Sequence, residues 1–217
     1  MNLLWIFKRT ITTFFKAGTN PNNNLTKLTF KRLLLLIFLL PLFLLSQLIN
    51  WVCFQIDEVF FKTYQKIKIR EPIFIIGPTR SASTYFYHLL ASDSQRFTTF
   101  RLWEILFAPT IVQKLFWIKL ANVDKRLGGF GKKTLLYFDK RWLSGINKIH
   151  KTSLFLPEED GLLFIHHFAT LYLAIIFPTN DKLLSYGQFD DEIEQSEKEQ
   201  IMRFYKKCLQ KLSLIHI

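Results

Sequence analysis

The stretch EPIFIIGPTRSASTYFYHLLASD, residues 71–93, decides how the fold of this chain is interpreted. Residues 72–76 form a short, unbroken apolar run, which is typical of a β-strand buried on both faces. Gly77 and Pro78 end this run, and residues 81–91 follow with apolar side chains at helical spacing. The order of strand, turn and helix predicts an α/β domain in which a loop leads directly into a helix N-terminus.

The turn between the predicted strand and helix has the composition of a phosphate-binding loop. Backbone N–H groups at a helix N-terminus bind phosphate oxygens. The hydroxyls of Ser81, Ser83 and Thr84 add hydrogen-bonding groups, and Arg80 supplies a planar cation suited to phosphate or sulfate. The alternative is an ordinary turn capped by Ser81. An ATPase or nucleotide kinase is disfavoured, because Ala82 and Ser83 stand where GxxxxGK[ST] requires a Gly-Lys pair.

The loop resembles that of the sulfotransferases that use 3′-phosphoadenosine 5′-phosphosulfate (PAPS), which typically reads P-I-F-I-x-G-x-x-R-S-G-T-T ahead of a helix. Two further landmarks of that family follow in the same order. The three landmarks are PIFIIGPTRSAST at residues 72–84 followed by LLA at 89–91, WE at 103–104 followed by Pro109, and His150 followed by PEED at 157–160. The resemblance covers approximately residues 67–212. It implies a P-loop-like, three-layer α/β sulfotransferase fold that is helix-rich.

The resemblance also implies an activity and a set of binding residues. The activity is transfer of a sulfuryl group from PAPS, as co-substrate, to a hydroxyl acceptor such as a carbohydrate. Arg80 takes the position of the catalytic basic residue that contacts the leaving phosphate, with Ser81, Ala82, Ser83 and Thr84 around the 5′-phosphosulfate. Ala82 stands where the family has Gly, so its Cβ crowds the bound phosphate if the backbone there needs a positive φ.

The acceptor hydroxyl needs a general base, and the candidates are carboxylates. Glu104 is the first, because protein-tyrosine sulfotransferases have a catalytic Glu at a comparable distance after the loop; the alternative is a solvent-facing partner of Arg101. Glu158, Glu159 and Asp160 are the second candidates, for the base or for substrate contact, and Glu159 is the one assigned as catalytic. The alternative there is a helix start after Pro157, where acidic residues stabilise the helix dipole. His150 is either a further base or acceptor contact, or an ordinary surface residue.

A separate apolar run predicts attachment to a membrane. Residues 33–54, LLLLIFLLPLFLLSQLINWVCF, contain no charged side chain and would extend roughly 33 Å as a helix, which matches a bilayer core. Residues 1–32 contain six Lys and Arg and no Asp or Glu, so the positive-inside rule predicts a cytoplasmic N-terminus. Trp51 is expected at the membrane interface. The domain is then luminal in the Golgi if the source is eukaryotic, because the sulfate donor is imported there; if the source is bacterial, we expect the domain to be cytoplasmic.

A second uncharged stretch, residues 161–177, raises the question of a return across the membrane. We favour a buried helix of a globular domain, because the stretch is shorter, holds His166 and His167 at its middle and ends at Pro178. Adjacent histidines point apart on a helix, which argues against a metal site, and no metal is expected. The charges of the last helix, within residues 190–211, are expected to form a solvated face.

The composition limits the remaining classes of function. The 217 residues include 29 Lys and Arg against 17 Asp and Glu, a net charge of +12, and 49% are hydrophobic. The chain is therefore neither disordered nor, with 2 Cys, a disulfide-stabilised scaffold. The basic residues are scattered, without a basic helix or an aromatic platform, so nucleic acid is not an expected partner. The expected partners are a membrane and a small-molecule or glycan acceptor.

These predictions give a domain organisation and two functional hypotheses. We expect a cytoplasmic basic tail (1–32), a transmembrane helix (33–54), a linker (55–70) and a sulfotransferase-like domain (71–217). The family's Ser- and Arg-bearing segment for the 3′-phosphate has no match, which predicts that the C-terminal part of the domain is missing. The first hypothesis is an active sulfotransferase. The alternative, favoured by Ala82 and the missing segment, is a catalytically inactive, membrane-anchored scaffold or binding protein.

Overall fold

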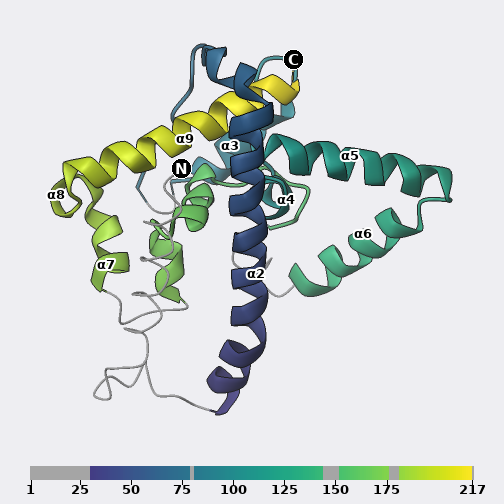
Figure 1. Ribbon diagram of the computed structural model, residues 1–217, viewed down its shortest axis with the longest axis horizontal. Coiled ribbons are helices and arrows are strands. Elements are labelled where there is room, and N and C mark those ends of the chain that lie inside the picture. Colours follow the sequence, from purple (N-terminus) through teal and green to yellow (C-terminus); the bar gives the residue numbers. More distant parts are fainter. Residues whose placement is uncertain (1–29, 79–80, 144–151, 176–180, 217) are drawn as a thin grey trace. The chain divides into compact units, whose positions relative to one another are not determined.

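A computed structural model gives the fold and describes residues 30–78, 81–143, 152–175 and 181–216. The chain divides into two compact units, and each unit combines segments that are distant in sequence. Unit 1 comprises Met1–Ile56 and Gly161–Lys206, and unit 2 comprises Asp57–Asp160 and Lys207–Ile217. Helices α2 (Phe30–Phe60) and α9 (Gln195–His216) contribute residues to both units (Figure 1).

Unit 1 packs short helices against the longest helix, α2. The short elements are the 3₁₀ helices η4 (Asp160–His167), η5 (Leu171–Ile175) and η6 (Ser185–Gln188), and the α-helices α7 (Asp181–Leu184) and α8 (Phe189–Glu192). The core joins Trp51 of α2 to Phe168, Leu173 and Leu183, with Ile201 of α9. Burial of these apolar side chains is the main contribution to the stability of the unit.

Helix α2 has an apolar exposed face and a polar buried face within unit 1. The exposed side chains recur every three or four residues and are Phe38, Leu42, Leu45, Ile49 and Val52. The buried face presents Gln47 and Asn50 to His166, whose Nδ1 lies 2.8 Å from Gln47 Oε1 and 3.4 Å from Asn50 Nδ2. By length and composition, α2 is the one described helix able to cross a membrane, at Leu40–Phe60. The predicted helix is therefore present.

Two expectations for unit 1 are corrected by its packing. Trp51, expected at a membrane interface, is buried in the core, and its Nε1 donates a hydrogen bond to the carbonyl oxygen of His166 at 2.9 Å. The second apolar stretch is buried as expected, but it does not form one continuous helix. Phe168 has a left-handed backbone with φ of 51°, which separates η4 from η5.

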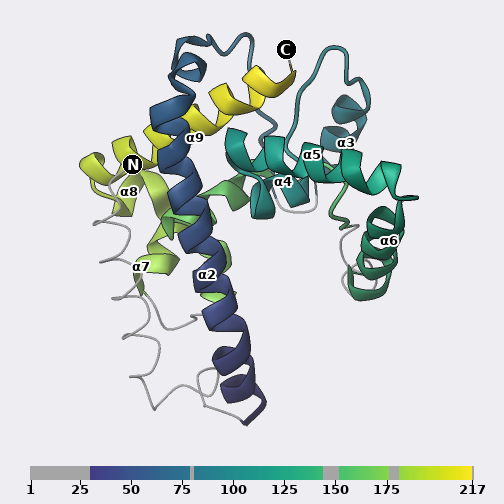
Figure 2. The same ribbon diagram turned by 45° about the vertical axis from the view of Figure 1, so that its right-hand side comes forward.

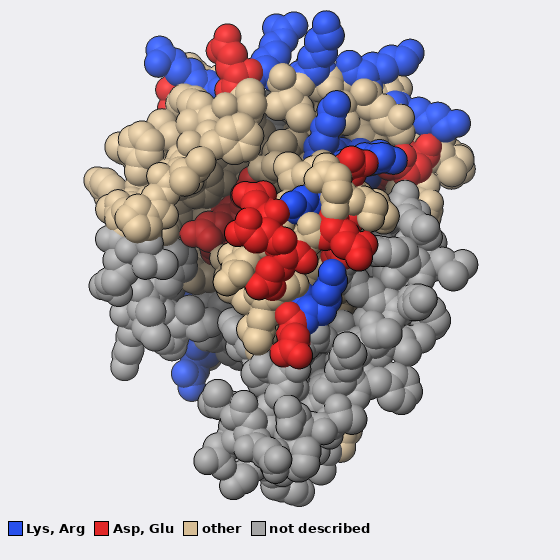
Figure 3. All heavy atoms as spheres, turned by 90° about the vertical axis from the view of Figure 1, so that its left-hand side faces the viewer, with Lys and Arg blue, Asp and Glu red and all other residues tan. Residues whose placement is uncertain are grey.

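Acidic side chains gather on one face of unit 1, over α7, α8 and the start of α9 (Figure 3). The exposed members are Asp181, Asp190, Asp191, Glu192, Glu194 and Glu199. Glu197 is an exception, because it is buried, accepts a hydrogen bond from the hydroxyl of Tyr186 and pairs with Lys182 at 2.8 Å. The start of α9 is thus fixed to α7 and η6 by one carboxylate.

Unit 2 is built from helices that follow one another along the chain. They are the 3₁₀ helix η2 (Lys62–Lys66) and the α-helices α3 (Ser83–Ser92), α4 (Leu102–Phe107), α5 (Ile111–Arg126) and α6 (Phe130–Leu143). After α5 the chain turns back into α6 (Figure 2). The Asp124 carboxylate stabilises this turn by accepting hydrogen bonds from the backbone N–H groups of Gly131 and Lys132 at 2.7 and 2.9 Å.

The end of α9 belongs to unit 2, and its basic residues are not on a solvated face as expected. Lys211 is 2% exposed and Lys207 is partly buried. Lys207 Nζ lies 2.9 Å from Glu58 Oε2, and Lys211 Nζ lies 4.9 Å from the centre of the Tyr64 ring. These lysines of α9 therefore lie beside partners that are distant in sequence, because a buried charge without a partner is costly.

The predicted strand at residues 72–76 is wrong for the described structure. Residues 72–78 form neither helix nor strand, and Ile73, Phe74 and Ile76 are exposed. An apolar run becomes a strand only where neighbouring backbone pairs with it, and no strand occurs among the described residues. The described parts are helix-rich, and the expected three-layer α/β architecture is not confirmed.

Candidate functional site

The predicted phosphate loop ends at the N-terminus of α3 in unit 2. Ala82 is the N-cap residue, and no side chain forms a capping hydrogen bond there, so the alternative of a turn capped by Ser81 is wrong. Ser81 and Ala82 are exposed, and Ser83 and Thr84 are partly exposed. Arg80 lies outside the described residues. The first turn of α3 therefore offers backbone N–H groups that no capping side chain occupies.

Among the described residues of the loop, one glycine lies close to a side chain and one residue has a strained backbone. A Cβ added at Gly77 would lie 2.6 Å from the Ser81 Oγ, so a larger residue there would require the Ser81 hydroxyl to move. Ala82 has φ of 60° and ψ of 19°, in the left-handed region. This is the residue for which the sulfotransferase pattern has Gly, and a left-handed alanine costs roughly 1–2 kcal/mol. The backbone at this position has the conformation that glycine adopts without strain.

The other two landmark segments are paired with each other. Arg101 and Pro157 form an isolated antiparallel bridge. The backbone N–H of Leu102 donates to Leu156 O at 3.2 Å, and the N–H of Trp103 donates to Leu154 O at 3.0 Å. The segment that carries Trp103-Glu104 therefore lies against the segment that leads into Pro157-Glu158-Glu159-Asp160.

Helix α3, which follows the loop, packs on the same paired segments in unit 2 through Tyr87 and His88. The hydroxyl of Tyr87 donates to Glu158 O at 3.3 Å, and Nε2 of His88 lies 3.1 Å from Pro157 O. Burial, followed by the charge of Asp160, raises the pKa of Tyr87 above its usual range. Tyr87 therefore keeps its proton and donates at neutral pH.

Glu104, the first candidate base, is buried and engaged by two donors. Its Oε1 lies 2.7 Å from Lys114 Nζ, and its Oε2 accepts a hydrogen bond from the backbone N–H of Arg101 at 2.8 Å. The side chains of Glu104 and Lys114 are 7% and 10% exposed. The expected alternative, a solvent-facing partner of Arg101, is therefore wrong, because Glu104 binds the backbone of Arg101 in the interior of the unit.

Glu159, the second candidate base, is exposed, whereas its neighbours Glu158 and Asp160 are partly buried. Asp160 lies in the first turn of η4, in agreement with the helix-start interpretation of this acidic run. The third candidate, His150, lies outside the described residues.

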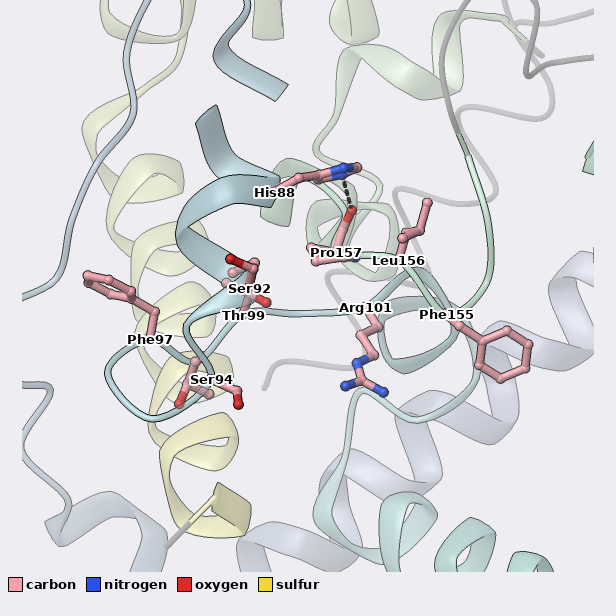
Figure 4. Close-up of a pocket in the computed structure, with 11 residues that line it drawn as sticks. His88, Ser92, Ser94, Phe97, Thr99, Arg101, Phe155, Leu156 and Pro157 are labelled. Atoms are coloured by element: carbon pink, nitrogen blue, oxygen red, sulfur yellow. Dashed lines mark hydrogen bonds between the residues drawn. The ribbon is translucent and has the colours of Figure 1, made fainter. Parts of the chain in front are cut away.

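A pocket of about 280 Å³ lies between the three landmark segments (Figure 4). Helix α3 contributes His88 and Ser92, the loop after it contributes residues 94 and 97–99, and the bridged segments contribute Arg101 and residues 155–157. Of the pocket residues, Ala91 and Pro157 belong to the landmarks and Arg101 was named as a possible partner of Glu104. The sequence did not single out the other pocket residues, Lys114 or Tyr87. No motif marks them, since their positions depend on contacts between segments that are distant in sequence.

Among the described residues, no group of three or more His, Cys, Asp or Glu side chains is placed to hold a metal ion. No family model, no curated protein sequence and no solved structure matches the chain.

Proposed function

We propose that the chain is a membrane-anchored sulfotransferase that moves a sulfuryl group from PAPS to a hydroxyl of a carbohydrate or similar acceptor. The observation that carries this proposal is the contact of helix α3, which follows the loop, with the other two landmark segments in unit 2. Helix α3 after the loop contacts Pro157 and Glu158, and the residues around Arg101 pair with the same segment. Segments that share one reaction must lie together, although they are far apart in sequence.

The loop residues fit the phosphosulfate part of the donor. The donor supplies an activated sulfuryl group whose leaving phosphate gains negative charge during transfer. The uncapped N–H groups of α3 and the hydroxyls of Ser81, Ser83 and Thr84 are suited to bind its oxygens. Arg80 is assigned to the leaving phosphate by the resemblance. Together these groups would hold the donor and stabilise the developing charge.

The base that accepts the proton of the acceptor hydroxyl is assigned to a carboxylate. Glu104 and Glu159 remain the candidates. Glu159 is exposed, whereas Glu104 would have to leave its buried pair with Lys114 to accept a proton. The geometry therefore favours Glu159 as the base and Glu104 as a residue that positions Arg101.

The alternative function, an inactive scaffold or binding protein of the same fold, is favoured by three observations. Glu104 is held by Lys114, and residues 72–78, most of which are exposed, form no strand. Strain at Ala82 points the same way, because the backbone conformation suits Gly.

The proposal includes the location of the protein. Helix α2 crosses the membrane once, with the basic N-terminal tail in the cytoplasm, and the membrane is that of the Golgi if the source is eukaryotic. Support comes from the length and apolar composition of Leu40–Phe60 and from its exposed apolar face.

Equilibrium binding of 3′-phosphoadenosine 5′-phosphate to the full chain tests the proposal. Arg80→Ala is expected to weaken binding by on the order of a hundredfold, the scale of losing one preorganised donor. Ala82→Gly is expected to keep or improve binding, because it restores the family's residue. Arg96→Ala is the matched control, since Arg96 is an exposed cation of unit 2 whose partner is Asp93. Equal binding by all four proteins, or binding by none, would favour the scaffold.

A further inference from the structure

The guanidinium of Arg101 is a charge that its own surroundings leave uncompensated. Among the described residues, no carboxylate forms an ion pair with it, and Arg101 is exposed. Glu104, the nearest acid in sequence, uses one oxygen for Lys114 and the other for the backbone N–H of Arg101. The backbone of Arg101 is thus fixed by the bridge to Pro157, while its guanidinium is left for another anion.

The pocket around Arg101 is lined by apolar side chains and by hydroxyl-bearing side chains, and it carries no acidic side chain. Arg101 is the one Lys, Arg, Asp or Glu among its lining residues, and Ser94, Thr98 and Thr99 supply hydroxyl groups. In Figure 4 the Arg101 side chain extends into the space between the loop that carries Ser94 and the segment that carries Phe155. A planar cation beside several hydroxyls is suited to a carboxylate or sulfate, because the guanidinium binds two oxygens at once.

We propose that this pocket binds an anionic group of the acceptor, a carboxylate or a sulfate on a sugar next to the one that is modified; this identity as an acceptor site rests on the proposed function. His88 and Ser92 line the pocket and lie five and nine residues beyond Ser83 in α3. At about 1.5 Å per residue, the pocket is roughly 7–14 Å along the helix from its N-terminus. The bound anion is therefore separate from the reacting hydroxyl.

The pocket is small, and hydrogen bonds tie its walls together. Its volume of about 280 Å³ is just below the usual range for ligand pockets, which begins at roughly 300 Å³, so it suits a small anionic group. The walls are firmly placed, because Leu102 N–H donates to Leu156 O and His88 Nε2 lies 3.1 Å from Pro157 O. A preorganised pocket binds a ligand without the cost of ordering its own side chains and loops.

The test is equilibrium binding of three disaccharides to the full chain in detergent. One carries a glucuronate carboxylate, one carries a sulfate and one is neutral. We expect both anionic probes to bind more tightly than the neutral one, and Arg101→Gln to weaken them about tenfold to a hundredfold, as for a lost hydrogen bond to a charged group. Arg96→Gln is the control, because it removes the same charge from the same stretch but does not line the pocket.

Each outcome decides for or against the pocket. Equal weakening by Arg101→Gln and Arg96→Gln, equal binding of the neutral probe, or no binding of any probe would overturn it. Far-ultraviolet circular dichroism of each variant verifies that the exposed substitution has left the fold intact. Binding of the nucleotide with no binding of the sugars refutes the pocket and leaves the proposed function standing. Arg101-dependent sugar binding without nucleotide binding supports an anion-binding pocket and refutes the transfer reaction.

Discussion

The carboxylate of Asp57 and the ammonium of Lys211 lie 3.0 Å apart in the interior of unit 2, with the two side chains 0% and 3% exposed. The same carboxylate accepts hydrogen bonds from the backbone N–H groups of Ile111 and Val112 at 2.8 and 3.1 Å. These N–H groups belong to the first turn of α5. One side chain therefore joins the end of α2, the start of α5 and the end of α9.

Replacement of Asp57 by Asn is expected to lower the free energy of unfolding by about 3–5 kcal/mol, because Lys211 would be left buried without its anion. The double variant Asp57→Asn/Lys211→Met should recover part of this loss. Asp93→Asn is the control, because its pair with Arg96 is exposed and worth about 0–1 kcal/mol. Denaturant unfolding in detergent, followed by circular dichroism, measures all three. Similar losses for Asp57→Asn and Asp93→Asn would contradict the buried pair.

Glu104 gives a prediction that separates a structural carboxylate from a catalytic one. Glu104→Gln should destabilise the protein by about 3–5 kcal/mol, because Lys114 then has no anion in the interior. Glu104→Gln/Lys114→Met should restore most of the stability. The same unfolding measurement applies. A fully stable Glu104→Gln protein that has lost transfer activity would instead identify Glu104 as the base.

Ala82→Gly should raise the free energy of unfolding by roughly 1 kcal/mol, because glycine adopts the left-handed conformation without strain. Ala91→Gly in the same helix is the matched control, and it should lower stability by about 0.5–1 kcal/mol, since glycine weakens a helix. Thermal unfolding of both variants measures the expected gain in stability for Ala82→Gly and the expected loss for Ala91→Gly. A stability loss on Ala82→Gly would mean that the backbone at this position is not left-handed.

Cys208 predicts a pH dependence. Burial raises the pKa of its thiol to about 12. At pH 8 only about one molecule in 10⁴ would carry the reactive thiolate, so iodoacetamide should modify the native Cys53→Ser protein very slowly and the unfolded protein rapidly. The unfolded thiol loses its proton first as pH rises, so the contribution of Cys208 to stability should fall from about pH 9 to 12. Alkylation of native and unfolded protein at equal rates would contradict its burial.

Single-pass topology is tested with two introduced cysteines in a Cys53→Ser/Cys208→Ser background. Thr12→Cys lies in the basic tail, and Lys125→Cys lies in the last turn of α5, where it is exposed. An impermeant maleimide applied to sealed vesicles should reach one of the two positions, with Thr12→Cys on the cytoplasmic side. Labelling of both positions from the same side would show that α2 does not cross the membrane.

Local sequence patterns predicted the helices of this protein better than the contacts between segments that are distant in sequence. The apolar run of α2 and the helical spacing after Ser81 are visible in the sequence, and both helices are present. The strand at residues 72–76 was wrong, because a short apolar run carries no information about whether another strand lies beside it. Lys211 was expected in solvent, because its partner Asp57 lies in a distant segment that no spacing rule connects to it. Ala82 was the informative residue of the loop, since its strained backbone agrees with the family's preference for Gly.

The discontinuous construction of unit 2 also sets an order of events during synthesis. Glu58 and Lys207, which pair at 2.9 Å, are separated by 149 residues. At about 5–20 residues per second, the ribosome needs roughly 8–30 seconds to extend the chain from the first to the second. During that interval the acidic end of α2 has left the ribosome without its cations. The contacts that α9 makes with the first part of unit 2 can therefore form only after most of the chain has been made.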